Sequence, residues 1–196
     1  MKKESAYDFL LRMAIPAVAF PAELKKEGNK TDYSNKVVWE CISRAHRDVL
    51  AGRKNVRDYS SNRENGLNKV AKELYFQITE NKGRISSEKL IAHFVNEKGY
   101  RIGTTQKLVN MTLKYMFLLQ LFGKLEGYSI KEDDCDCPLD SRILDSIGEG
   151  DRKWTNDFKK NDNDDSYKVY SNIQNKIKDK QAAGSKLLYD FEKWQN

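Results

Sequence analysis

Lys107 and Asp140 are the residues of this sequence whose types and settings best suit joint chemistry. The stretch from Thr104 predicts a helix that opens on Thr104 and Thr105 and carries Lys107 in its first turn. The positive end of the helix dipole repels a lysine charge there, which favours the neutral amine that attacks carbon. Asp140 precedes a short amphipathic stretch, so it is expected at a helix start, where a carboxylate could stabilise a developing cation. The pair predicts amine-and-carboxylate chemistry.

Both residues also have structural interpretations. A lysine in a first turn can be an ordinary surface residue, and aspartate is among the best N-cap residues. Lys114 lies seven positions after Lys107, so the two share about the same helix face. Lys114 is therefore the second candidate for the amine, although it could instead reach solvent from the edge of the core. The catalytic and structural interpretations both stay open at this stage.

Almost every periodic segment of the chain predicts a helix. Apolar residues recur at helical spacing over residues 5–19, 35–51, 65–79, 86–99 and 105–122, and one or two closing helices are expected within residues 166–194. No convincing strand pattern occurs, so the predicted class is all-α. We expect residues 1–150 to form a helical core with the hairpin and the site, and residues 151–196 to pack on it. Residues 151–165 predict either a short helix or a loop.

Two short segments resemble a known family. Gln106-Lys107-Leu108-Val109-Asn110 and Pro138-Leu139-Asp140-Ser141-Arg142-Ile143 are similar to the active-site half of the helix-hairpin-helix DNA glycosylases, the endonuclease III superfamily. Their spacing is closest to that of the archaeal 8-oxoguanine DNA glycosylases. The resemblance implies two helical lobes around a cleft, a double-stranded DNA partner, removal of a damaged base and no cofactor. It also implies that Lys107 attacks the sugar carbon while Asp140 stabilises the cationic sugar.

The resemblance also implies contacts to the DNA backbone. Arg101, Thr104 and Thr105 fall in the expected hairpin, and Lys114 and Arg142 are further candidates; for these residues capping, ion pairing and solvation are the structural alternatives. The chain departs from the family in its hairpin, which has Gly99 and Gly103 but no proline, and in lacking the four-cysteine iron–sulfur segment. A non-catalytic nucleic-acid-binding or partner-binding protein is the alternative, as is an unrelated helical protein.

Composition sets wider bounds. The net charge of +6 permits an anionic partner without proving one. Three cysteines without framework spacing indicate a reducing compartment, and two histidines without a ligand partner at metal-binding spacing predict no metal site. No secretory signal and no membrane-spanning run is evident, so a cytoplasmic location is expected. The oligomeric state does not follow from the sequence.

Overall fold

The computed structural model describes residues 33–51, 61–81, 85–150, 163–180 and 185–195. Within these ranges the chain forms helices and no β-strand, which confirms the all-α class. The α-helices are α2 (Tyr33–Ala51), α3 (Ser61–Glu80), α4 (Ser87–Ala92), α5 (Ile102–Leu121), α6 (Ser141–Ser146), α7 (Asn163–Lys180) and α8 (Lys186–Gln195). A π-helical turn, η2 (His93–Glu97), continues α4, and a 3-10 turn, η3 (Glu132–Asp134), precedes α6. The helix expected over residues 5–19, and most of the segment 151–165, lie outside the described residues.

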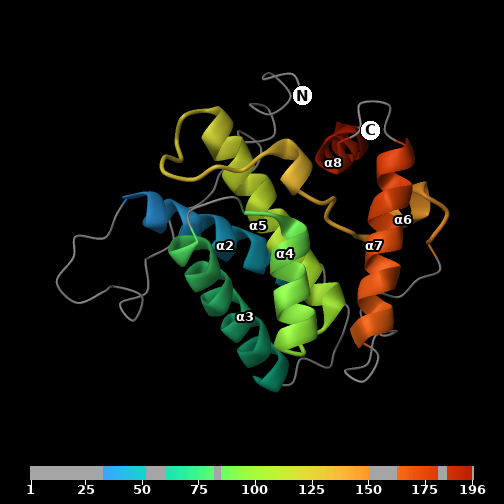
Figure 1. The fold of residues 1–196 in the computed structure, drawn as a ribbon, viewed down its shortest axis with the longest axis horizontal. Coiled ribbons are helices and arrows are strands. Elements are labelled where there is room, and N and C mark those ends of the chain that lie inside the picture. The colour runs from blue at the N-terminus through green and yellow to red at the C-terminus, as the bar shows by residue number, and fades with distance from the viewer. Residues whose placement is uncertain (1–32, 52–60, 82–84, 151–162, 181–184, 196) are drawn as a thin grey trace.

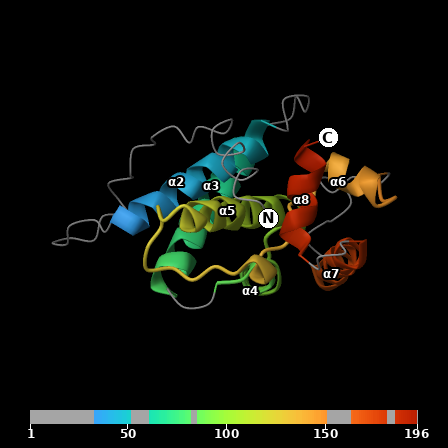
Figure 2. The ribbon, with the colours of Figure 1, turned by 90° about the horizontal axis from the view of Figure 1, so that it is seen from above.

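The central element of the fold is α5. Figures 1 and 2 show α2 and α3 on one side of this helix and α6, α7 and α8 on the other. Every residue from Leu108 to Leu118 is buried, as expected for a helix with neighbours all round. Leu108, Met111 and Tyr115, which recur at helical spacing, are each at most 5% exposed. The long helix therefore forms the core of the molecule.

The predicted helix, glycine-bearing turn and helix between residues 91 and 121 is confirmed. Gly99 ends the first helical stretch with a φ of 66°, a left-handed conformation that glycine adopts without steric cost. The Gly99 N–H donates to the carbonyl of Val95 at 3.2 Å. Gly103, expected to supply a second turn, instead lies inside α5. The turn between the helices is thus shorter than the sequence indicated.

A long irregular connection joins α5 to α6 and then crosses the core. Buried side chains at Leu125, Tyr128 and Ile130 hold its first half against the helices. From residue 134 to residue 139 every residue is buried.

No helix in the part of the chain that the structure describes combines the length and hydropathy needed to cross a bilayer.

Candidate functional site

The start of α5 differs from the sequence prediction. The helix begins at Ile102 with Arg101 as its N-cap residue, rather than at the two threonines. Lys107 is consequently the sixth residue of the helix and lies in its second turn. The field of the helix dipole falls off within the first turn, so the argument that the dipole favours a neutral amine at Lys107 loses its basis. The expectation of a first-turn lysine was wrong because Ile102, which is 1% exposed, anchors an earlier helix start in the core.

Three polar residues line one edge of this helix start. Arg101 is exposed, and Thr104 and Lys107 are half-buried. Thr104 and Lys107 are three positions apart, so their side chains are neighbours on the helix surface. Arg101 precedes Thr104 by the same interval and lies at the same edge of the helix start. Arg101 makes no side-chain cap hydrogen bond, so the first backbone N–H groups of α5 have no cap from its side chain. This arrangement presents positive charge and N–H donors together.

Thr105, also expected to contact DNA, does not belong to that edge. Its side chain is 1% exposed and faces the core, because the earlier helix start rotates it inward. Its N–H donates to the carbonyl of Arg101 at 3.2 Å. A DNA contact through the Thr105 side chain is therefore incompatible with this conformation.

Asp140 caps α6, as the sequence predicted. Its Oδ1 accepts a hydrogen bond from the Ile143 N–H at 3.0 Å, and its backbone is extended. At the other end Gly148 has a φ of 76°, and the Glu149 N–H donates to the Leu144 carbonyl at 2.8 Å, so the helix ends at this glycine. The structural role of Asp140 as a helix cap is confirmed. One of its two carboxylate oxygens, Oδ1, accepts the capping hydrogen bond.

A buried glutamine joins the segments that carry Lys107 and Asp140. Gln106 Nε2 donates to the Leu139 carbonyl at 3.0 Å, and its Oε1 accepts from the Leu139 N–H at 3.1 Å. One side-chain amide thus pairs with both backbone groups of one residue, as a neighbouring β-strand would. We call this a two-point amide contact. It places the residues immediately before Lys107 and Asp140 side by side.

Two further glutamines make the same kind of contact to this connection. Gln174 of α7 accepts from the Cys137 N–H at 3.1 Å and donates to the Cys137 carbonyl at 2.8 Å. Gln120, near the end of α5, accepts from the Ile130 N–H and donates to the Ile130 carbonyl, both at 2.9 Å. The connection from α5 to α6 is therefore held at Ile130, Cys137 and Leu139 by side-chain amides.

Further polar side chains extend this network through the core. Asn110 Nδ2 donates to the Cys137 carbonyl at 3.2 Å, and its Nδ2 lies 2.9 Å from the Tyr170 hydroxyl. Tyr170 donates in turn to Asp136 Oδ2 at 2.6 Å, and Lys186 forms an ion pair with Asp136 Oδ1. Burial, and then the charge of Asp136, raise the pKa of the Tyr170 hydroxyl well above its ordinary value, so it remains a donor.

Lys114 is buried rather than near the edge of the core. Its side chain is 0% exposed and forms an ion pair with Asp190 of α8, which is 2% exposed. Its Nζ also lies 4.7 Å from the centre of the Phe191 ring. Lys114 therefore neither reaches solvent nor contacts DNA in this conformation, which corrects both expectations. The element that covers it, α8, is separated from it by more than seventy positions, so local sequence gave no sign of the pair.

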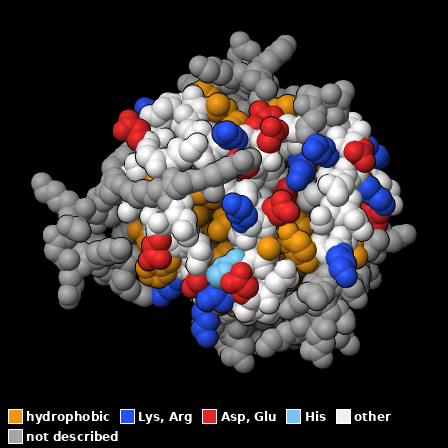
Figure 3. Space-filling view, viewed as in Figure 1, with side chains coloured by type: hydrophobic (Ala, Val, Ile, Leu, Met, Phe, Trp, Pro, Cys, Tyr) orange, Lys and Arg blue, Asp and Glu red, His pale blue; other side chains and the backbone are white. Residues whose placement is uncertain are grey.

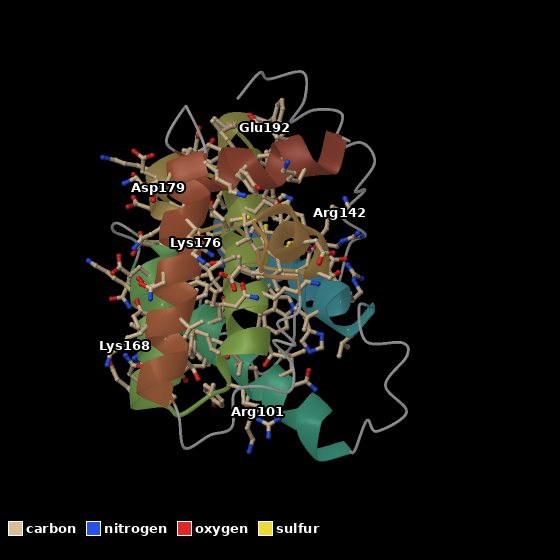
Figure 4. The ribbon with its side chains drawn as sticks, turned by 90° about the vertical axis from the view of Figure 1, so that its right-hand side faces the viewer. Arg101, Arg142, Lys168, Lys176, Asp179 and Glu192 are labelled. Carbon is tan, nitrogen blue, oxygen red and sulfur yellow. The ribbon has the colours of Figure 1, made fainter. Side chains whose placement is uncertain are left out.

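Arg142 is exposed, and its Nη1 donates to the carbonyl of Lys193 in the last turn of α8 at 3.4 Å. Figure 4 shows Arg101 and Arg142 well apart on one side of the molecule, so they do not form a single cationic cluster. Figure 3 shows basic and acidic side chains interspersed over the described surface of another face. The positive charges on the described surface of that face thus do not form a single basic patch.

The cysteines do not form a reactive group. Cys41, Cys135 and Cys137 are free and buried. Burial is the main cause that raises the pKa of each thiol above its ordinary value, which keeps the thiols neutral. Among the described residues no group of three or more His, Cys, Asp or Glu side chains could hold a metal ion.

Removal of a damaged base would also require an aromatic side chain that stacks on the extruded base, and the aromatic residues available have varied settings. Tyr128 is buried, and its hydroxyl donates to Asn35 Oδ1 at 2.7 Å, which removes it from such a role. Trp39 packs edge-on against Tyr75, with ring centres 5.8 Å apart. Tyr100 is half-buried beside Phe94, and Phe122 is half-buried at the end of α5. Trp154 and the Trp194 side chain lie outside the described residues.

The structural role of three polar residues of α5 was not predicted from the sequence. Gln106, Asn110 and Lys114 recur every four positions of the helix and are all fully buried. That periodic polar stripe was a usable signal, because buried polar groups require partners. The partners themselves, Gln174 and Asp190, come from distant helices and had no local signature.

Comparisons with protein-family models, with curated proteins and with solved structures find no match to this chain.

Proposed function

We propose that the protein binds the phosphate backbone of double-stranded DNA through the start of α5. The observation that carries this proposal is the edge formed by Arg101, Thr104 and Lys107 at a helix start that the Arg101 side chain does not cap. Helix-start N–H groups and nearby cations favour phosphate, because both the dipole and the charges attract an anion. The overall charge of +6 favours the same class of partner.

The test is duplex binding measured by fluorescence anisotropy at several salt concentrations. We expect the affinity to fall steeply with salt, because phosphate contacts release counterions. Replacing both Arg101 and Lys107 with alanine should reduce the slope of log affinity against log salt by about 2, roughly one unit for each lost phosphate contact. Lys124→Ala is the matched control, since Lys124 is exposed just beyond the opposite end of α5. Equal effects from both changes would contradict the proposal.

A second candidate function is base excision by Lys107 and Asp140 in a glycosylase-like fold. The two-point amide contact of Gln106 with Leu139 favours it, because this contact brings the segments that carry the two residues together. In this proposal the helical groups on the two sides of α5 correspond to the two lobes. Lys107 would form a Schiff base with the sugar, and Asp140 would stabilise the cationic sugar. An oxidised purine is the proposed lesion.

Single-turnover excision on a panel of damaged duplexes, with borohydride trapping, tests this second function. We expect Lys107→Gln to abolish trapping, because glutamine has no nucleophilic amine. Asp140→Asn should keep the fold, since asparagine also caps helices, and lose most excision. Wild-type protein that binds the duplexes but excises nothing and is not trapped would leave DNA binding as the function.

A further inference from the structure

The buried cation Lys114 receives its counter-charge from the C-terminal helix. Asp190 and Phe191, both on α8, supply a carboxylate and a ring to the same ammonium group. A buried ion pair is an inefficient means of stabilising a core, because desolvating both charges offsets most of their attraction. An apolar pair of similar volume would serve stability at least as well. The charges at this position therefore suit a role in which the pair separates.

The same helix also covers α6. Arg142 Nη1 donates to the Lys193 carbonyl at 3.4 Å, and Ser146 Oγ lies 2.8 Å from the Tyr189 hydroxyl. Burial raises the pKa of Asp190, the charge of Lys114 opposes that rise, and the charge of Asp140 adds to it. Asp190 is thus a carboxylate paired with a buried lysine of α5, on a helix that also contacts α6.

We propose that α8 competes with nucleic acid, with the Asp190 carboxylate occupying the position on Lys114 that a backbone phosphate takes when α8 is displaced. This inference rests on the proposed DNA binding and adds to it a second phosphate contact and its regulation. Lys114 lies seven residues beyond Lys107 on the same helix, about 10 Å along the axis. One strand could then contact the start and the middle of α5 once α8 has moved.

The first measurement is amide hydrogen exchange of the full-length protein with and without a duplex oligonucleotide. We expect DNA to slow exchange at the start of α5 and to accelerate it in α8, although ligands ordinarily protect. Exchange in α8 that is unchanged or slowed by bound DNA would overturn the inference while leaving the proposed function intact.

The second measurement is the affinity of charge variants for the same duplex. Asp190→Asn should bind at least tenfold more tightly, the factor expected if α8 is displaced in far fewer than a tenth of wild-type molecules. Glu192→Gln is the matched control, because it removes the same charge from an exposed position of α8. The double variant Lys114→Met with Asp190→Leu keeps α8 docked through apolar contact, so it should bind no more tightly than wild type.

These variants separate the two ideas. Equal gains from Asp190→Asn and Glu192→Gln would show a general charge effect and refute competition by α8. Binding by Asp190→Asn alone, with none by wild type, would support competition in its strongest form. No binding by any variant would overturn the proposed function and this inference together.

Discussion

The two-point amide contacts make a quantitative prediction about stability. In Gln106→Leu the side chain keeps its approximate volume, but the Leu139 N–H and carbonyl lose their partners. Gln106 is 0% exposed and its bonds to Leu139 are buried, so water cannot readily replace them. Each buried backbone group left unsatisfied costs about 1–3 kcal/mol, which gives a loss of about 2–6 kcal/mol.

Gln120→Leu is the matched control on the same helix. It removes the same two bonds from Ile130, but Gln120 is half-buried and its contacts are only partly shielded. Water can therefore substitute, and the expected loss is about 1 kcal/mol.

Urea unfolding followed by circular dichroism measures both losses, and equal slopes of free energy against urea concentration would show that the same surface is exposed in each variant. A Gln106→Leu variant that is as stable as Gln120→Leu would refute the argument. In that case the amide contacts would form where the connection already lies, without contributing to the stability of that position.

Three further predictions concern other parts of the core. Lys114→Met should cost about 3–5 kcal/mol, because it leaves Asp190 buried without its cation; adding Asp190→Leu should recover most of that loss in urea unfolding. Burial raises the pKa of all three thiols above the ordinary value of 9.0, so above that pH the unfolded chain releases protons that the folded chain keeps. The contribution of the thiols to the free energy of unfolding is therefore complete below about pH 9 and is lost as the pH rises. A urea midpoint lower at pH 10 than at pH 7 would confirm this, and an unchanged midpoint would contradict it. Gly148→Ala should cost about 1–2 kcal/mol in thermal unfolding, because alanine is strained at a φ of 76°; an unchanged melting temperature would argue against that strain.

Helix positions could be predicted from the sequence because they depend on local periodicity and caps. The helices α2, α3 and α5, the Asp140 cap and the turn at Gly99 were all predicted close to their observed places. The start of α5 was placed late because Gly103 suggested a turn. Whether a helix continues through a glycine depends on tertiary anchoring, here the burial of Ile102.

The polar interior could not be predicted in the same way. Lys114 and Asp190 meet only after α8 folds back on α5, and Gln106 finds Leu139 only once the connection crosses the core. These contacts depend on where distant elements pack, and no window of sequence contains both partners. Thr105 illustrates the consequence, because a small shift in the helix start moved it from an expected surface into the core.

The glutamine contacts also bear on how the folded chain behaves at high concentration. An extended segment normally presents a row of unpaired N–H and carbonyl groups, and such a row templates pairing with a second molecule and, eventually, fibrous aggregation. At Cys137 and Leu139 both backbone groups are already paired with glutamine side chains in the interior. The segment thus gains an extended geometry without a strand edge, and its cysteine- and leucine-bearing backbone stays out of reach of neighbouring molecules.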